Sequence, residues 1–398
     1  MNTANHIKRE DFIYCDYAAT GPLRPEVQDV MAAAQLLPGN PSSIHRPGQA
    51  ARVTLERARR EVAQAINAPP KAIRFTSGGT EANNTVLAGV LRSGDHVVTS
   101  QIEHPSVSAP LEALARRGVK VTAVPADSSG RVPLERIAAA CLPETRLISI
   151  MTVNNETGAI NDLAAVGKLA TDKGVLVHTD AVQAFGKLPI DGPAWGVHFL
   201  SASAHKIGGP KGVGLLFIRP GTTLPPMILG GSQENGGRGG TENVAGAVGF
   251  ARAVQLAVAG QADLISRLTN YRELFLEHIT KAGVAHEVNG CECFPGVLNL
   301  RFPGIPGQAM VINLDAAGVA ASYGSSCASG SANASHVLRA MGLSSRAALE
   351  SVRFSFGYGT NEDQVSAAAR IVCAVVSQMS GSAALVDDAL SKVGESLG

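Results

Sequence analysis

The chain is poor in charged and in aromatic side chains for its length of 398 residues. Charged residues make up 17% and aromatic residues 4%, whereas hydrophobic residues make up 45%. The net charge of +1 gives no reason to expect a surface for nucleic acid. No apolar run approaches the length of a membrane span, and the amino terminus lacks the apolar segment of a signal peptide. We therefore expect a soluble, cytoplasmic protein that binds neither nucleic acid nor a membrane.

Disulfide and metal-binding patterns are also missing. The six cysteines are scattered along the chain and form no disulfide framework. The motifs C-x-x-C and H-E-x-x-H do not occur, and the pair Cys291 and Cys293 is too short and isolated for zinc. We expect no metal, and we interpret Cys15, Cys141 and Cys373 as inert hydrophobic residues.

Short apolar segments and amphipathic segments alternate through the middle of the chain. The predicted strands are 72–76, 96–100, 119–124, 147–153, 175–179, 198–203 and 213–218. Predicted helices lie between most of them, for example 80–91, 105–116 and 163–173. This alternation favours an α/β fold with a mainly parallel, doubly wound sheet, whose ligands bind at the carboxyl ends of the strands.

The length predicts a second domain, since one core rarely serves so long a chain. The later part predicts helices at 243–258 and 261–282, strands near 296–302 and 351–356, and helices near 308–317, 333–341 and 361–379. This order indicates a smaller α+β domain.

A lysine follows the end of one predicted strand. The segment 198–203 ends in small residues and leads to His205 and Lys206, before the turn Gly208-Gly-Pro-Lys-Gly212. A lysine in a dry pocket gives up its proton more readily and can form a Schiff base. A solvated lysine in a loop is the alternative, and this segment alone does not exclude it.

Two other strand ends carry polar side chains. Thr76 and Ser77 begin a small-residue turn before a predicted helix, where hydroxyls and free N–H groups would favour a phosphate. An ordinary helix cap at Thr80 is an alternative of equal weight. Asp180 ends another strand and needs a partner, such as a protonated ring nitrogen. A cap on the next helix is again an alternative of similar weight.

These strand ends together supply a Schiff-base lysine, a phosphate site and a carboxylate for a ring nitrogen. Pyridoxal phosphate (PLP) requires all three groups. Asp180 would keep the pyridine nitrogen protonated, so that the ring can accept electrons from the substrate. The set therefore predicts a PLP enzyme.

The motifs of a known enzyme family run along nearly the whole chain. They are Asp16-Tyr-Ala-Ala-Thr, Thr76-Ser-Gly-Gly-Thr-Glu, Glu103-His-Pro, Val153-Asn-Asn-Glu-Thr-Gly, His178-Thr-Asp-Ala-Val-Gln, Ser203-Ala-His-Lys-Ile-Gly-Gly-Pro-Lys-Gly, Arg238-Gly-Gly-Thr-Glu-Asn, Gly324-Ser-Ser-Cys-Ala-Ser-Gly and Val352-Arg-Phe-Ser. In these motifs the chain closely resembles the NifS/IscS-type cysteine desulfurases, in the class V aminotransferase group of fold-type I PLP enzymes. The resemblance implies a homodimer. It also implies a large PLP-binding domain at 16–259 and a small domain formed by 1–15 and 260–398.

The resemblance assigns roles around the cofactor ring. Lys206 would carry the cofactor as a Schiff base, and Asp180 would pair with the ring nitrogen. Gln183 would hydrogen-bond to the ring oxygen. His104 would stack on the ring face and could move protons.

Other matched positions would bind the phosphate and the substrate. The predicted phosphate ligands are Thr76, Ser77, Ser203, His205 and Thr241, the last reaching in from a second subunit. Asn155 and Arg353 would bind the substrate carboxylate, and a guanidinium suits this role because it donates two parallel hydrogen bonds. A surface salt bridge is the alternative for Arg353.

Cys327 lies in a run of small residues before a predicted helix. A thiol in such a loop can be exposed and carried from the active site to an acceptor. The resemblance implies that Lys206 removes the α-proton of L-cysteine, that Cys327 takes the sulfur as a persulfide, and that L-alanine is formed. The sulfur would pass to an acceptor or to an iron–sulfur scaffold protein.

Two features depart from the family. Asn235 stands where many members have arginine, and the segment 383–398 lacks the aromatic, histidine-rich ending of the housekeeping IscS type. Other functions left open are a selenocysteine lyase, another class V aminotransferase-like enzyme, and a scaffold that binds partners without catalysis. The Cys327 loop argues against a simple transaminase, which needs no thiol.

Overall fold

The computed structural model describes residues 12–324 and 334–395. The chain divides into two compact units. The large unit consists of Ala19–Asn155 and Ala159–Leu264. The small unit consists of Met1–Ala18, Glu156–Gly158 and Ile265–Gly398.

A seven-stranded sheet is the centre of the large unit. Its strands are β2 (Ile73–Thr76), β3 (His96–Ser100), β4 (Lys120–Val124), β5 (Thr145–Ser149), β6 (Leu176–Asp180), β7 (Phe199–Ser203) and β8 (Gly214–Ile218). Their order in the sheet is β2-β8-β7-β6-β5-β3-β4. Strand β8 is antiparallel to both neighbours and the other pairings are parallel, so every strand except β8 runs in one direction. The prediction of a mainly parallel sheet is confirmed.

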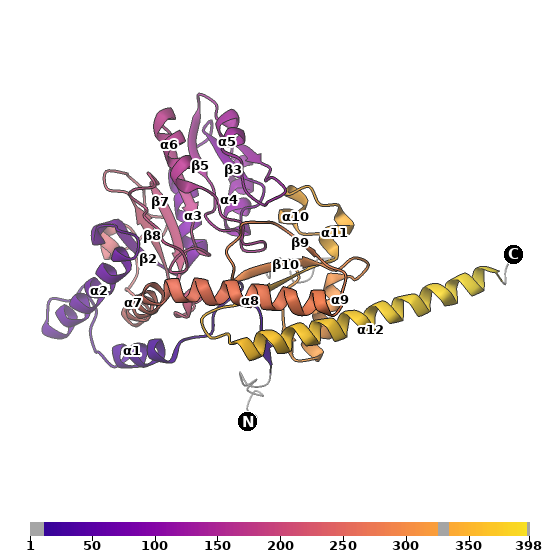
Figure 1. The fold of residues 1–398 in the computed structure, drawn as a ribbon. Coiled ribbons are helices and arrows are strands. Elements are labelled where there is room, and N and C mark those ends of the chain that lie inside the picture. The colour runs from indigo at the N-terminus through magenta and orange to yellow at the C-terminus, as the bar shows by residue number, and fades with distance from the viewer. Residues whose placement is uncertain (1–11, 325–333, 396–398) are drawn as a thin grey trace. The chain divides into compact units, whose positions relative to one another are not determined.

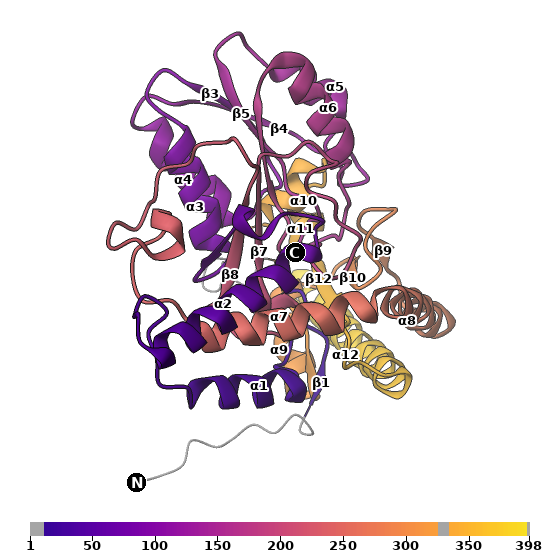
Figure 2. The ribbon, with the colours of Figure 1, turned by 90° about the vertical axis from the view of Figure 1, so that its left-hand side faces the viewer.

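Helices cover both faces of this sheet. They include α3 (Gly79–Val90), α4 (Pro105–Ala115), α5 (Leu134–Ala140) and α6 (Leu163–Lys173). In Figure 2, α3 and α4 lie on one side of the sheet and α5 and α6 on the other. The fold is therefore doubly wound, as the alternation of strands and helices predicts.

Three further helices belong to the large unit. They are α1 (Pro25–Gln35), α2 (Arg46–Gln64) and α7 (Val244–Ala259), and α7 packs against both others (Figure 1). The 3-10 segments are η2 (Pro70–Ala72), η3 (Ala204–Ile207) and η4 (Gln233–Gly236).

Helix α3 is held on the sheet by apolar side chains. Val86 and Leu87 are fully buried in one cluster with Phe199 of β7 and Leu216 of β8. Each such side chain contributes about 1.5–3 kcal/mol of burial free energy. This packing fixes the amino terminus of α3 beside the carboxyl end of β2.

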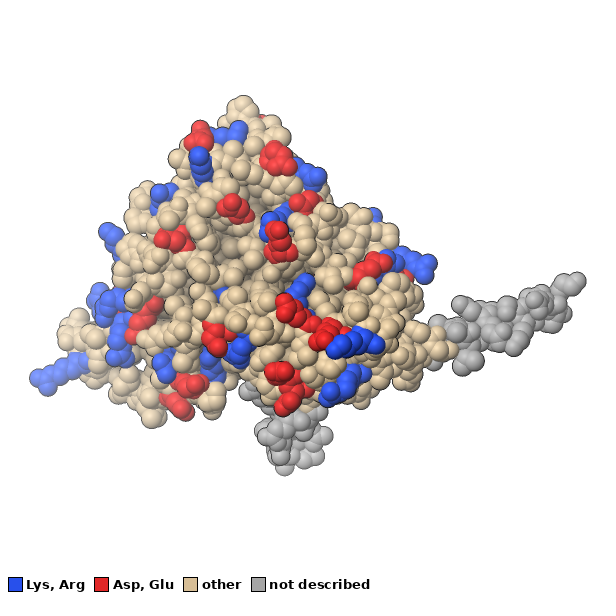
Figure 3. Space-filling view, viewed as in Figure 1, with Lys and Arg blue, Asp and Glu red and all other residues tan. Residues whose placement is uncertain are grey.

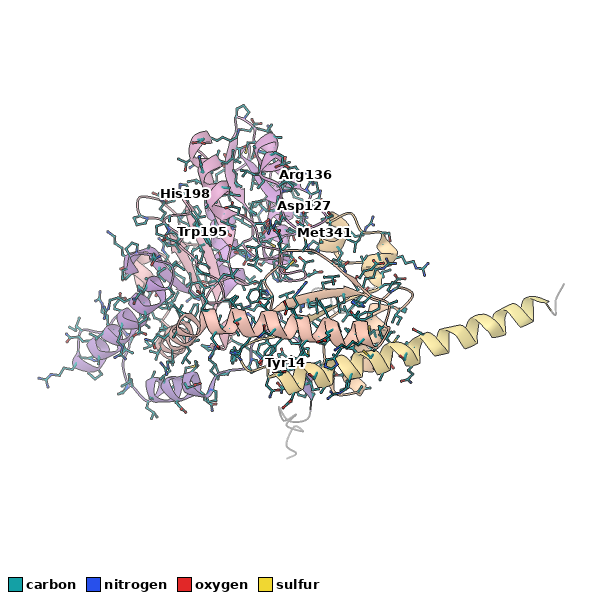
Figure 4. The ribbon with its side chains drawn as sticks, in the orientation of Figure 1. Tyr14, Asp127, Arg136, Trp195, His198 and Met341 are labelled. Atoms are coloured by element: carbon teal, nitrogen blue, oxygen red, sulfur yellow. The ribbon has the colours of Figure 1, made fainter. Side chains whose placement is uncertain are left out.

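The amino-terminal end of β7 is fixed by its neighbours. A β-carbon at Gly167 of α6 would lie 1.7 Å from the Trp195 carbonyl oxygen, so the glycine allows a close approach. His198 accepts a hydrogen bond from the Val177 N–H at 3.1 Å. Trp195 and His198 are labelled in Figure 4. These contacts set the position of β7, whose other end leads into η3.

The small unit is α+β, as predicted. Its strands are β1 (Ile13–Tyr14), β9 (Glu287–Val288), β10 (Val297–Arg301), β11 (Val319–Ala320) and β12 (Ser351–Ser355). Strands β12-β10-β9 form an antiparallel sheet, and β1 pairs with β11 in parallel. Its helices are most of α8 (Gln261–Lys281), α9 (Gly307–Ala316), α10 (His336–Ala340), α11 (Ser345–Leu349) and α12 (Glu362–Glu395).

The ends of strand β5 and helix α12 differ from the prediction. Strand β5 ends at Ser149, because Val153 turns back and pairs with Ile160 instead of continuing the ladder. Helix α12 continues to Glu395, whereas the prediction ends at 379. No proline interrupts the sequence after 379, so nothing in the backbone stops the helix there.

Candidate active site

The carboxyl edge of the large sheet brings several predicted residues to one side of the unit. Thr76 ends β2, Asp180 ends β6, and Lys206 follows β7 in η3. His104 and Asn155 lie in the segments that follow β3 and β5. Since these strands run in the same direction, their carboxyl ends share one edge of the sheet.

The predicted phosphate loop is built on a close backbone contact. Thr76, Gly214 and Ser203 are neighbours in register across β2, β8 and β7. A β-carbon at Gly214 would lie 2.6 Å from Gly78 Cα and from the Ala202 oxygen. Glycine at 214 therefore lets the loop after β2 lie directly over the sheet.

Helix α3 begins at a glycine beside the Ser203 hydroxyl. The cap residue is Gly78, which has no side chain to cap the helix, so the alternative of an ordinary cap at Thr80 is wrong. A β-carbon at Gly78 would lie 3.9 Å from Ser203 Oγ, so bare backbone faces that hydroxyl. Ser77 is exposed, and its N–H donates to Glu81 at 2.9 Å. Hydroxyls, bare backbone and a helix amino terminus together suit a phosphate.

Lys206 is half-buried and hydrogen-bonded. Its Nζ donates to the Ala19 carbonyl oxygen at 2.6 Å, so the side chain is not that of a freely solvated loop lysine. The neighbouring His205 lies 3.1 Å from Thr20 Oγ1 through its Nδ1. Burial and the positive charges of nearby lysines lower the pKa of His205 to about 3. A neutral imidazole still has one N–H to donate to a phosphate oxygen.

Asp180 is almost completely buried and accepts two hydrogen bonds. Its Oδ1 accepts from the Val182 N–H at 3.0 Å, and its Oδ2 accepts from Asn83 Nδ2 at 2.7 Å. The residues after Asp180 form turns, so Asp180 does not cap a helix as the alternative supposed. Because ionised carboxylates are buried only with partners, this arrangement suits a carboxylate that meets a cation.

Gln183 is oriented by a lysine. Lys187 Nζ donates to Gln183 Oε1 at 2.9 Å, and both side chains are buried. A protonated lysine can only donate, so the amide oxygen of Gln183 faces it. The amide N–H groups consequently suit an acceptor such as a ring oxygen.

The loop that carries Thr241 is anchored by a buried ion pair. Glu234 accepts from Arg59 at 2.6 and 3.0 Å and from the Phe75 N–H of β2 at 3.0 Å. Thr241 itself is exposed. Asn235, the departure from the family, has a φ of 56°, a conformation that asparagine tolerates better than most residues.

The small unit holds the predicted substrate arginine. Arg353 lies in β12, is 2% exposed, and its Nη2 donates to Asp16 Oδ1 at 2.7 Å. The alternative of a surface salt bridge is therefore wrong. Ser322 and Arg353 exchange backbone hydrogen bonds of 3.1 and 2.8 Å, which places the segment leading towards 327 beside β12. Cys327 itself lies outside the described residues.

Sequence reasoning missed Asn83 and Ser106. Asn83 Nδ2 donates to Ser106 Oγ at 2.8 Å as well as to Asp180, and Ser106 Oγ lies 2.7 Å from His104 Nδ1. The position of Asn83 in the sequence could have indicated that its side chain is buried. Asn83 is a polar residue three and four positions before Val86 and Leu87, on the apolar face of α3.

The donor set of the large unit fits PLP. It contains a half-buried lysine, a paired buried carboxylate, an amide turned to donate, and a glycine-containing loop after β2 beside the Ser203 hydroxyl. Among residues 12–324 and 334–395, no cluster of histidine, cysteine or acidic side chains could hold a metal ion.

Comparisons with known proteins agree with this geometry. The family model Aminotransferase class-V matches residues 13–367. The cysteine desulfurase IscS of Dictyoglomus turgidum is 43% identical over 365 residues, which cover 90% of this chain and 92% of that protein. A solved NifS-like protein aligns with a TM-score of 0.86 at 34% identity, covering 92% of this chain and 99% of its own. A structure of SspA in complex with cysteine aligns with a TM-score of 0.78 at 32% identity. The alignment covers 86% of this chain and 98% of that one. The chain belongs to the class-V aminotransferase family, whose enzymes depend on PLP.

Proposed function

We propose that this protein is a PLP-dependent cysteine desulfurase, which converts L-cysteine to L-alanine and takes the sulfur onto Cys327. The observation that carries the proposal is the set of Lys206, Asp180 and the glycine-lined loop at Thr76 on one sheet edge. Relatives named cysteine desulfurase over nearly the full length of the chain support the substrate.

Several residues of the large unit would hold the cofactor, which supplies an electron sink for the substrate α-carbon when bound. The Asp180 carboxylate would pair with the protonated ring nitrogen, and the Gln183 amide would donate to the ring oxygen. Lys206 Nζ would attach the cofactor and take the α-proton. The phosphate would be bound by Thr76, Ser77, Ser203, His205 and Thr241.

Arg353 and Asn155 would bind the carboxylate of cysteine. Arg353 is held in place by its backbone bonds in β12 and by Asp16, so the guanidinium is ordered before the substrate arrives. A preorganised guanidinium binds a carboxylate at little cost in side-chain entropy. Charge-assisted binding of this kind suits a small amino acid substrate.

Cys327 would act as the sulfur acceptor. Its thiolate attacks the sulfur of the bound cysteine, an S–S bond forms, and the C–S bond breaks. The carbon fragment keeps the electron pair of that bond and is protonated, so that it leaves as alanine. The products are alanine and a persulfide on Cys327, and no external oxidant is needed.

We also propose the cellular setting. The exposed position of Thr241, on a loop anchored by Arg59 and Glu234, suits a residue that serves a second subunit of a homodimer. The two units correspond in this proposal to the domains predicted at 16–259 and at 1–15 with 260–398. The sulfur would pass to an acceptor or iron–sulfur scaffold protein in the cytoplasm.

Two observations bear on other partners. No helix in the part of the chain that the structure describes is long and apolar enough to cross a bilayer. Basic and acidic side chains are interspersed over the face seen in Figure 3, which gives no extended basic surface there for nucleic acid.

The test is an assay of alanine with the holoenzyme and its Cys327→Ala variant. The wild-type protein should turn yellow with PLP and release alanine from L-cysteine in the presence of a reductant. Cys327→Ala should bind the cofactor equally and lose alanine formation. A variant that makes alanine at the wild-type rate contradicts the role of Cys327, and a protein that does not bind PLP favours a scaffold without catalysis.

A further inference from the structure

Four polar side chains of the large unit form a continuous hydrogen-bond chain at the sheet edge. It runs from Asp180 through Asn83 and Ser106 to His104, with contacts of 2.7, 2.8 and 2.7 Å. Three of its members are buried, with exposures of 5% for Asp180, 0% for Asn83 and 8% for Ser106. A buried chain of this kind has fixed donors and acceptors, because water cannot replace a wrong partner.

Asp180 sets which groups donate and which accept along this hydrogen-bond chain. An ionised carboxylate only accepts, so the Asn83 group that lies 2.7 Å away must be its amide nitrogen. The same nitrogen lies 2.8 Å from Ser106 Oγ, and its two hydrogens are thereby both used. Ser106 Oγ is consequently an acceptor in this contact and keeps its own hydrogen for another.

The hydrogen of Ser106 Oγ goes to His104. The backbone N–H of Ser106 already donates to His104 Nδ1 at 3.0 Å, because His104 is the cap residue of α4. Nδ1 therefore carries a lone pair and no proton. Ser106 Oγ, at 2.7 Å, donates to the same nitrogen.

We propose that Asn83 and Ser106 are positioning residues that hold His104 in the tautomer with its proton on Nε2. Two donors point at Nδ1, so a proton there would leave both without an acceptor. His104 can then donate through Nε2 but cannot serve as a base at Nδ1. The assignment of His104 to the cofactor ring rests on the proposed function, whereas the tautomer does not.

This arrangement gives His104 and Lys206 different roles in proton transfer. A histidine that only donates cannot take the α-proton of the substrate, which leaves that step to Lys206. The side-chain amide of Asn83 also donates to both Asp180 and Ser106. It therefore positions the carboxylate proposed for the ring nitrogen and, through Ser106, the histidine proposed to stack on the ring. The Oδ1 atom of Asn83 has no hydrogen-bond partner among the described residues, which costs free energy that the two bonds of Nδ2 offset.

The tautomer can be read directly by NMR. The experiment uses full-length protein with ¹⁵N-labelled histidine, with and without PLP, and identifies the His104 signals by their loss in His104→Gln. We expect Nδ1 to resonate as an unprotonated nitrogen and Nε2 as a protonated one in both forms. A protonated Nδ1 at neutral pH overturns the proposal.

Ser106→Ala removes one donor and keeps the backbone N–H. We expect the Nδ1 resonance to move towards that of a nitrogen with fewer hydrogen bonds, and kcat to fall about 5- to 10-fold with a smaller change in KM. Ser149→Ala is the matched control, since Ser149 is a buried serine 2.8 Å from a different histidine, His178. Ser149→Ala should shift the ¹⁵N resonances of His178 and leave those of His104 unchanged. Unchanged His104 signals in Ser106→Ala overturn the proposal.

Asn83→Leu tests the link to Asp180, with Asn84→Leu on the outer side of the same helix as its control. We expect Asn83→Leu, and not Asn84→Leu, to shift both the His104 signals and the visible absorbance of bound PLP. If Asn83→Leu does not fold, Ser106→Ala still decides the matter. An Nε2–H tautomer in a protein that makes no alanine from cysteine would uphold this inference and overturn the proposed function.

Discussion

Glu103 shows at the scale of one residue how burial sets chemistry near the site. It is 1% exposed, and its Oε1 accepts from Ser100 Oγ at 2.5 Å and from the Met151 N–H at 2.9 Å. Burial raises the pKa of the Glu103 carboxyl to about 8, even though these hydrogen bonds favour the ionised form. Glu103 directly precedes His104 in the chain.

The raised pKa predicts how stability depends on pH. The folded protein keeps a proton that the unfolded chain loses above its ordinary pKa of 4.5. The contribution of Glu103 is therefore complete below 4.5 and is lost as the pH rises through about 8. Glu103→Gln should remove this loss, so that its free energy of unfolding exceeds that of the wild type by on the order of 5 kcal/mol above about pH 8.

Urea unfolding at a series of pH values measures this difference. The exposed Glu112→Gln on α4 is the control and should follow the wild-type profile. Parallel profiles of wild type and Glu103→Gln across the whole range would show that the pKa of Glu103 is the same in the folded and the unfolded protein, and would contradict the prediction.

Among the secondary-structure elements, the register of β2, β8 and β7 positions the loop after β2, and Gly214 shows this most clearly. It lies between Thr76 and Ser203, and its missing side chain leaves room for Gly78. Gly214→Ala should cost about 1–3 kcal/mol of folding free energy and weaken PLP binding, because the phosphate loop must move. Denaturant unfolding and absorbance titration of the apoprotein measure the two effects.

The control for Gly214→Ala is Gly260→Ala. The nearest atom to a β-carbon at Gly260 is the Leu256 oxygen at 3.4 Å, an ordinary contact. If Gly214→Ala binds PLP as tightly as Gly260→Ala does, the contact between Gly214 and Gly78 does not position a phosphate-binding loop.

The pair of Arg59 and Glu234 joins α2 to the loop that carries Thr241. Both side chains are 3% exposed, so removing one partner leaves a buried charge. Arg59→Met should lower the free energy of unfolding by about 3–5 kcal/mol, and Arg59→Met with Glu234→Met should recover part of it. The exposed Arg60→Met should change it by less than about 0.5 kcal/mol, as surface substitutions usually do.

Thermal and urea unfolding of the four proteins measure these values. Equal losses for Arg59→Met and for Arg60→Met would mean that the ion pair does not anchor the loop.

The sequence predicts the strand ends well because they depend on local patterns. Apolar runs followed by small or polar residues locate Asp180 and Lys206, and the parallel order follows from the alternation of strands and helices. The contact between Asn83 and Asp180 joins residues 97 positions apart, and that between Arg59 and Glu234 joins residues 175 apart. Such pairs depend on tertiary packing, which no local pattern reports.

The whole molecule divides its predicted chemistry between its two units. The large unit carries Lys206, Asp180 and the phosphate loop, and the small unit carries Arg353 with Asp16. The sequence also assigns Cys327 to the small unit's part of the chain. In this account the large unit activates cysteine and the small unit supplies the carboxylate ligand and the sulfur acceptor.

The most direct test of this account is mass spectrometry of the Cys327 peptide after the holoenzyme has reacted with L-cysteine and no reductant. We expect this peptide to gain the mass of one or more sulfur atoms, a reductant to remove them, and the same peptide of Lys206→Ala to gain none. Added sulfur on the exposed Cys291 with none on Cys327 would contradict it.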